Sequence, residues 1–208
     1  MDLVSPEIEA YAEQVTSPHE ALLEELSVET IRDSVGPAGM LTGPVAGRFL
    51  ELLVWAMQPK RVLEIGTLTG HSALAMAAAL PADGHLDACE LDPERAAVAQ
   101  RYFDRSAHGS KITLHVGPAL DTIARLEGEF DFVFLDADKG GYVDYYEAVL
   151  PRLSERGLIA ADNTLLGGSV LDGEGPIVGF NEHVASDPRT VQVLLTVRDG
   201  ITLIRRAY

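Results

Sequence analysis

The chain has 208 residues, of which 47% are apolar and 23% are charged, and its formal net charge is −16. This length and apolar content fit one globular domain over residues 1–208 and exclude disordered and fibrous proteins. Thirty-two acidic residues against sixteen basic ones disfavour a nucleic-acid partner, because the summed charge would repel phosphate backbones.

The longest uncharged apolar stretch, at 73–80, is far shorter than the ~20 residues that a membrane span needs. No signal-peptide pattern opens the chain, and the single Cys89 cannot form an internal disulfide. We therefore expect a cytoplasmic protein that does not contact a membrane.

Residues 1–57 are expected to form N-terminal helices. Ser5 precedes a proline at a helix start, and Ser-Pro-His-Glu at 17–20 has the pattern of a capping box in front of an apolar stripe. A turn rich in glycine and proline at 36–44 comes before another helix, and Trp55 lies off the apolar face of that helix. The apolar face consists of Val45, Phe49, Leu50, Leu53 and Met57.

Residues 58–208 are expected to form an α/β core in which short apolar strands alternate with helices. The predicted strands are at 61–65, 85–90, 111–116, 130–135 and 157–161, and the predicted helices are at 70–80, 93–107, 119–127 and 142–153. This alternation is typical of βαβ units, which build a parallel sheet with helices on both faces.

The chain ends in a different pattern. Two β-rich runs at 191–197 and 201–205 are joined by Arg198-Asp199-Gly200, which is a hairpin signal. The predicted fold is therefore a Rossmann-like, seven-stranded, mostly parallel sheet with a C-terminal antiparallel hairpin.

Ligands of such sheets bind at the carboxyl ends of the strands, so the residues after each strand are candidate site residues. Gly66 and Gly70 follow the first strand, but neither the dinucleotide fingerprint nor the P-loop pattern is present. Glu90 ends the second strand, where an acidic side chain can accept both ribose hydroxyls. A glycine turn with a ribose carboxylate but no pyrophosphate cradle favours S-adenosylmethionine; the alternatives are a plain β–α turn and a solvated strand end.

Asp136, Asp162 and Asn163 follow the fourth and fifth strands, so they are expected to converge. Three oxygen ligands without histidine or cysteine suit Mg²⁺ or a similar divalent cation, and the alternative is that these side chains cap helices. Lys139 lies within reach of a substrate bound there; without the metal site it would be an ordinary exposed lysine.

Four motifs at these strand ends are Leu63-Glu64-Ile65-Gly66, Gly117-Pro118-Ala119-Leu120, Asp136-Ala137-Asp138-Lys139 and Asp162-Asn163-Thr164-Leu165. Together they resemble the cation-dependent class I O-methyltransferases of the caffeoyl-CoA and catechol type, over residues 36–168. The resemblance implies that Asp136, Asp162 and Asn163 hold the cation and that Lys139 acts next to the substrate hydroxyl. The residues implied to contact S-adenosylmethionine are Thr42, Glu64, Gly66, Thr67, Ser72, Glu90, Ala119 and Asp138.

The resemblance implies transfer of a methyl group to one hydroxyl of a small catechol-type aromatic, by an enzyme that we expect to be a homodimer. A caffeoyl-CoA substrate is the alternative, but Gly167 stands where plant enzymes carry a substrate-contacting asparagine, and the acidic chain would repel a polyanionic CoA ester. Two further alternatives are an NAD-dependent oxidoreductase and a nucleoside-binding protein without turnover.

Two segments outside the sheet are expected to confine the acceptor. The stretch 167–176 contains four glycines and a final proline, which favours a flexible loop over the site. The helices within 5–33 are expected to pack on the sheet, on a dimer mate or over the acceptor pocket.

Overall fold

The computed structural model describes residues 4–32 and 41–208. Part of the predicted turn at 36–44 lies outside these residues. The α-helices are α1 (Pro6–Val15), α2 (Ala21–Arg32), α3 (Gly43–Met57), α4 (His71–Ala79), α5 (Pro93–Arg105), α6 (Ala119–Arg125), α7 (Tyr142–Val149) and α8 (Pro176–Ser186). The strands are β1 (Arg61–Ile65), β2 (His85–Glu90), β3 (Ile112–Val116), β4 (Phe130–Leu135), β5 (Leu153–Asp162), β6 (Thr190–Leu195) and β7 (Ile201–Arg206).

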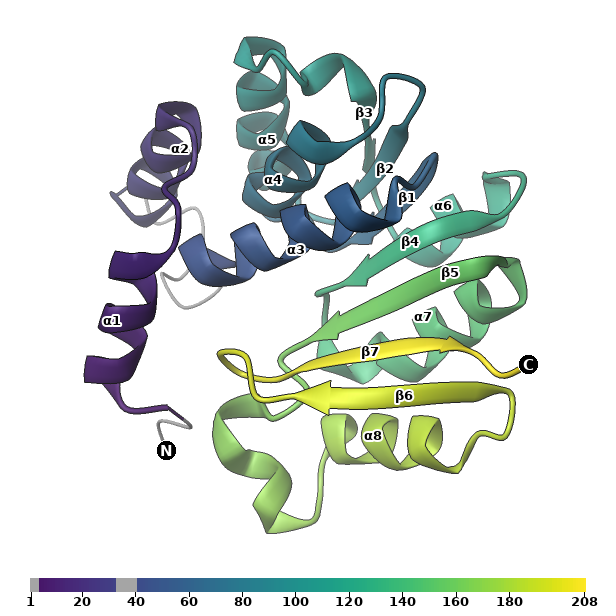
Figure 1. Cartoon of the computed structure of the whole chain (residues 1–208). Helices are drawn as coiled ribbons and strands as arrows, with labels where there is room; N and C mark the ends of the chain where they lie inside the picture. The colour runs from purple at the N-terminus through teal and green to yellow at the C-terminus, as the bar shows by residue number, and fades with distance from the viewer. Residues whose placement is uncertain (1–3, 33–40) are drawn as a thin grey trace.

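The strands form one sheet in the order β3-β2-β1-β4-β5-β7-β6 (Figure 1). Strands β1 to β5 pair in parallel, and β7 runs antiparallel to both β5 and β6. The predicted fold class is therefore confirmed. The order reverses between β1 and β4, and in open α/β sheets such a switch point is where ligands bind.

Helices cover both faces of the sheet, and the alternation of side chains along each strand supplies both cores. Val62 of β1 and Phe134 of β4 pack with α3, α4 and α5, whereas Leu63 and Leu135 pack with α6, α7 and α8. All four side chains are completely or almost completely buried. A strand buried on both faces is a near-continuous apolar run, which is why these strands were visible in the sequence.

Several element boundaries follow from local chemistry. Asp92 caps α5 as predicted, because its carboxylate accepts hydrogen bonds from the backbone N–H of Glu94 and Arg95. The prediction that a helix starts at 17–20 is wrong: α2 begins at Ala21. The carbonyl groups of this segment turn toward α3 instead, where Arg48 donates to the carbonyls of Ser17 and Pro18.

Other predicted boundaries also shift. Strand β5 is longer than predicted and begins at Leu153, and α7 ends at Val149, before a 3-10 helix (Leu150–Arg152) that contains a proline. The glycine-rich stretch after β5 contains a short 3-10 helix (Leu166–Asp172), within which Gly167 and Gly168 adopt left-handed φ angles. A regular helix is excluded there as predicted, and a lid function for this segment stays a prediction.

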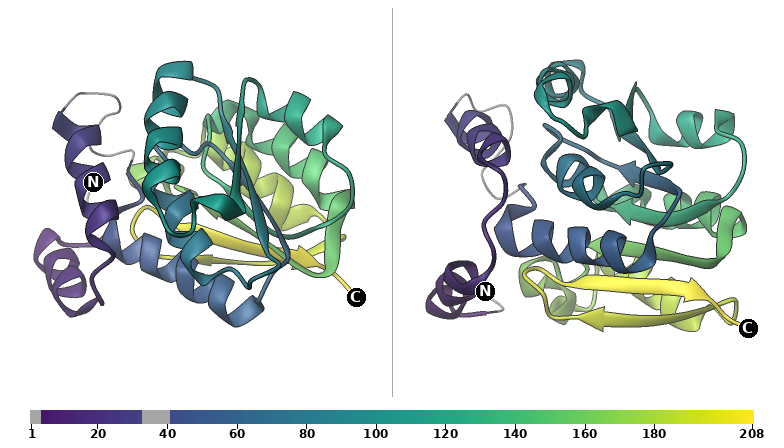
Figure 2. Two further views of the ribbon diagram at one scale, coloured as in Figure 1. Left: turned by 90° about the horizontal axis from the view of Figure 1, so that it is seen from above. Right: turned by 45° about the horizontal axis from the view of Figure 1, so that its top comes forward.

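The two N-terminal helices lie together at one end of the molecule (Figures 1 and 2). Helix α2 buries Leu23 and Leu26 in the core, whereas α1 buries no residue at all. Ile8, Tyr11 and Val15 of α1 are each more than 60% exposed. The expected homodimer stays a prediction, as does the role of α1. No helix among the described residues is long and apolar enough to cross a membrane.

Candidate active site

A cavity of about 710 Å³ opens at the carboxyl ends of β1, β2, β4 and β5, next to the switch point. Its volume lies in the usual range for a ligand pocket. It is lined by all but one of the predicted site residues, namely Thr42, Gly66, Thr67, Ser72, Glu90, Ala119, Asp136, Asp138, Lys139, Asp162 and Asn163. A second cavity of about 240 Å³, between the segment at 17–20 and α3 to α5, contains none of them.

Gly66 lets β1 and β4 meet at the floor of the cavity. It has a φ of 92°, and a Cβ at this position would lie 2.1 Å from the carbonyl oxygen of Asp136. The two strands are held together here because the N–H of Asp136 donates to the carbonyl of Ile65, at 2.9 Å. No residue with a side chain fits without moving the backbone of Asp136.

Glu64, the remaining predicted residue, lies beneath the cavity and is completely buried. Its two carboxylate oxygens accept short hydrogen bonds from the hydroxyls of Thr67 and Ser72. Burial raises the pKa of Glu64 to about 7, although these two hydrogen bonds act against the shift. Glu64 therefore stabilises the glycine turn from below. It does not line the cavity, so it can affect a bound ligand only by positioning Thr67 and Ser72.

Glu90 connects the glycine turn to the end of β2. Its Oε2 accepts a hydrogen bond from the N–H of Leu68 at 2.8 Å, and its Oε1 accepts one from the N–H of Asp92 at 2.9 Å. Burial raises the pKa of this carboxyl group, and the two backbone hydrogen bonds oppose that shift. Each carboxylate oxygen has a second lone pair, so Glu90 can still accept hydrogen bonds from a ligand in the cavity.

Lys139 connects residues of the predicted metal site. The Lys139 ammonium donates to Asp136 Oδ1 at 3.1 Å, to Asn163 Oδ1 at 2.8 Å and to Tyr142 Oη at 2.6 Å. Asp162 Oδ1 accepts from the N–H of Asn163 at 2.8 Å, and Tyr142 Oη donates to the Asp162 carbonyl at 2.9 Å. The structure thus brings together the four side chains that the sequence places at neighbouring strand ends.

The electrostatics of this cluster favour an additional positive charge. Burial, together with the negative charge of Asp136, raises the pKa of Asp162 to about 7. Burial also raises the pKa of Asp136, against which Lys139 acts as the main opposing charge. Lys139 forms an ion pair with Asp136, and its charge also lowers the pKa of the buried Asp162; the remaining oxygen donor is the amide of Asn163. Such an all-oxygen set fits Mg²⁺ or a similar hard cation.

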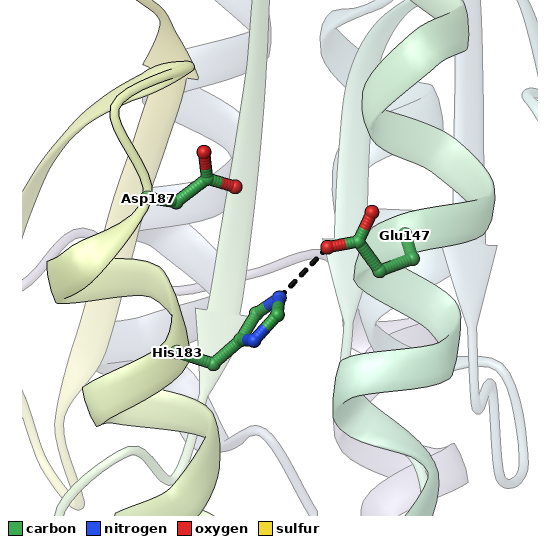
Figure 3. A group of neighbouring side chains, drawn as sticks. All are labelled: Glu147, His183 and Asp187. Carbon is green, nitrogen blue, oxygen red and sulfur yellow. Dashed lines mark hydrogen bonds and ion pairs between the residues drawn. The ribbon is translucent and has the colours of Figure 1, made fainter.

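A second group of possible metal ligands consists of Glu147 on α7, His183 on α8 and Asp187 directly after α8 (Figure 3). His183 Nε2 lies 2.7 Å from Glu147 Oε1. Arg189 already lies between the two carboxylates, because its Nη2 is 2.6 Å from Glu147 Oε1 and 2.6 Å from Asp187 Oδ2. We interpret this group as an ion-pair network between α7, α8 and β6, and none of its members lines the large cavity.

Several residues that line the cavity or support its walls have no functional assignment from the sequence. Tyr142 supports Lys139, His71 lines the wall near α3, and Arg198 and Asp199 reach the cavity from the β6–β7 turn. Tyr142 follows the lysine motif by three residues, which is a usable signal. For Arg198 the sequence predicts only a hairpin turn and no contact with the cavity.

Residues 12–207 match the pattern of an O-methyltransferase family. The caffeoyl-CoA O-methyltransferase of Stellaria longipes is 37% identical over 186 residues, which are 81% of this chain and 77% of that protein. The catechol O-methyltransferase of Niastella koreensis is 44% identical over 148 residues, which are 67% of this chain and 66% of that protein.

Among solved structures, the Podospora anserina methyltransferase bound to S-adenosylhomocysteine has a TM-score of 0.89 and 29% identity, with 97% of this chain and 94% of that chain covered. The chain therefore belongs to the O-methyltransferase family. Within it, the chain is an S-adenosylmethionine-dependent O-methyltransferase of the catechol and caffeoyl-CoA type.

Replacing Gly66 with alanine is expected to reduce stability by about 2–4 kcal/mol, because both the left-handed φ and the contact with the Asp136 carbonyl penalise a side chain. Urea unfolding measures this loss. Gly179→Ala is the matched control, since no atom lies within 4 Å of its Cβ position. Equal midpoints for the Gly66→Ala variant and the wild type would contradict the proposed contact.

Glu64 predicts a pH dependence of stability. Its pKa rises from 4.5 to about 7 on folding, so the folded protein holds a proton that the unfolded chain releases. The contribution of Glu64 to the free energy of unfolding is up to about 3 kcal/mol. It is fully present below about pH 4.5 and is lost as the pH rises through about 7. Glu64→Gln, which mimics the protonated form, should therefore gain stability relative to wild type between pH 5 and pH 8. A constant difference across these pH values would show that Glu64 does not titrate in this way.

Proposed function

We propose that this enzyme transfers the methyl group of S-adenosylmethionine to one hydroxyl of a small catechol-type aromatic, with a divalent cation held by Asp136, Asp162 and Asn163. The observation that carries the proposal is the cluster of Asp136, Asp162 and Asn163 with Lys139 in the large cavity. Similarity to a protein named catechol O-methyltransferase supports the acceptor class. Similarity to the plant enzymes keeps a caffeoyl-CoA acceptor as the alternative.

The donor side of the cavity suits S-adenosylmethionine. Gly66 and Thr67 line the cavity at the close contact between β1 and β4, and Thr67 and Ser72 are held in place from below by Glu64. Glu90 is the acceptor for ribose hydroxyls, while Thr42, Ala119 and Asp138 complete the walls. Asp138 is itself fixed, because its carboxylate accepts from the N–H of Gly141 at 2.9 Å and from Tyr145 Oη at 2.8 Å.

Lys139 is proposed to act next to the reacting hydroxyl. Three hydrogen bonds, to Asp136, Asn163 and Tyr142, hold its ammonium in place, and the ring centroid of Tyr142 lies 4.6 Å from Nζ. This fixed position allows Nζ to orient the acceptor oxygen and to take part in moving its proton. A divalent cation would contribute Lewis-acid chemistry, lowering the pKa of a catechol hydroxyl and orienting both oxygens. Fixed positions for two reactants can themselves account for about 7–11 kcal/mol of a reaction barrier.

The metal requirement is tested by removing divalent cations and then adding Mg²⁺ back. EDTA should abolish methylation of a catechol by the wild-type enzyme, and Mg²⁺ should restore it. Mg²⁺ should also raise the melting temperature of wild type, because a ligand that binds only the folded state stabilises it. Asp162→Asn should lose both effects, whereas Asp144→Asn, an exposed aspartate on α7, should keep them. Full turnover in excess EDTA would contradict the metal assignment.

The donor assignment is tested at Glu90. Glu90→Gln keeps an oxygen for one of the two backbone hydrogen bonds and removes the charge, so the affinity for S-adenosylhomocysteine should fall by about 1.5–3 kcal/mol. Titration calorimetry measures this, with exposed Glu94→Gln as the charge-matched control. Unchanged affinity in Glu90→Gln would leave Glu90 with a structural role only.

A further inference from the structure

Arg198 lies at a position where its backbone conformation is unfavourable. It belongs to the turn between β6 and β7, and its φ of 48° is in the left-handed region. Only a few per cent of residues other than glycine adopt such angles, and glycine would do so without strain. Strained residues of this kind persist where the surrounding structure holds them, and they cluster at functional sites. Arg198 also lines the cavity, so this strained position belongs to the candidate site.

One edge of the guanidinium holds the rim of the cavity. Arg198 Nη1 donates to the carbonyl of Leu41 at 2.9 Å and makes a short hydrogen bond to the carbonyl of Thr42. The next residue, Gly43, has a φ of 71°, and a Cβ there would lie 3.3 Å from Nη1. The backbone at the start of α3 therefore comes close to the Arg198 guanidinium at Gly43, where a side chain would be crowded.

The other edge of the guanidinium is available to a ligand. Within the described part of the chain, Nη1 makes all the hydrogen bonds of the Arg198 side chain, and no carboxylate forms an ion pair with it. Lys139, by contrast, already donates to three oxygens. The neighbouring Asp199 is committed elsewhere, because its Oδ1 accepts from the N–H of Gly167 at 2.5 Å. Nε and Nη2 thus remain as two donors beside the cavity.

The turn that carries Arg198 is joined to the segment that follows the proposed cation ligands. The N–H of Thr164 donates to the carbonyl of Gly200 at 3.0 Å, and the N–H of Leu165 donates to the carbonyl of Asp199 at 2.9 Å. Asp162 itself pairs with Ile201 at the start of β7. Arg198 therefore lines the cavity from the side of the proposed cation and methyl acceptor.

We infer that Arg198 binds a carboxylate of the methyl acceptor, so that the preferred substrates are catechols with an acidic substituent. This inference rests on the proposed function and narrows its substrate class. Guanidinium and carboxylate groups form charge-assisted, often bidentate hydrogen bonds, which need two donors on one edge. In a chain with a net charge of −16, an anionic acceptor needs such a local positive group.

The experiment compares 3,4-dihydroxybenzoate with its uncharged methyl ester in wild type, Arg198→Gln and Arg198→Lys. Wild type should have the higher kcat/KM for the acid. The acid-to-ester ratio of kcat/KM should fall about tenfold or more in Arg198→Gln, mostly through the KM for the acid. Glutamine retains an N–H₂ group for the carbonyls of Leu41 and Thr42, and lysine retains the charge, so Arg198→Lys should keep part of the preference.

Two results would overturn the inference while leaving the proposed function intact. An acid-to-ester ratio that is the same in wild type and Arg198→Gln would limit Arg198 to holding the rim. Weaker binding of S-adenosylhomocysteine by Arg198→Gln, matching the loss with the acid, would mean that the carboxylate is the donor's own. If wild type methylates neither compound, the catechol proposal itself fails, and the inference fails with it.

Discussion

The close approach of β1 and β4 at Gly66 determines how the rest of the site is built. At this point the order of the strands reverses, and the backbone of Asp136 lies where a side chain of residue 66 would be. The turn that holds the donor and the strand that carries the acidic cluster are therefore separated by one hydrogen-bonded contact. Transfer of a methyl group needs two reactants in line, and this contact fixes the relative position of their two binding surfaces.

The acidic residues of the site fall into two groups with different roles. Glu64, Asp136 and Asp162 are carboxylates whose pKa values are raised, chiefly by burial. Burial outweighs the two hydroxyl hydrogen bonds of Glu64, which favour its ionised form, so Glu64 holds a proton up to about pH 7 and acts as part of the scaffold. Asp136 and Asp162 have Lys139 and the field of Arg198 nearby, which favours their ionised forms. Carboxylic acids thus have two roles in the site: Glu64 stabilises the glycine turn, whereas Asp136 and Asp162 are the proposed cation ligands.

The sequence predicted the sheet because each parallel strand is a short apolar run that ends in a polar or glycine-containing segment. The same rule placed Asp136, Asp162 and Asn163 together, since parallel strands end at one edge of the sheet. Local signals were weaker where tertiary contacts decide the outcome. The residues at 17–20 match a capping box, yet Arg48 takes up two of their carbonyl groups and α2 starts later.

Long-range contacts account for what the sequence could not show. Arg198 reaches the carbonyl of Leu41 across 157 positions, and no pattern in either segment indicates the other. Glu64 shows the same limit in a different form. Its motif implied contact with the donor, but only the three-dimensional arrangement shows that Thr67 and Ser72 lie between its carboxylate and the cavity.

Helix α2 is linked to the donor turn although none of its described residues lines the cavity. Thr30 Oγ1 lies 2.8 Å from Thr69 Oγ1, and both side chains are completely buried. Because coupling between two sites is reciprocal, a donor that orders this turn also makes α2 harder to detach. Amide hydrogens of α2 would then exchange more slowly in the loaded enzyme, so the outer surface of the molecule reports whether the donor is bound.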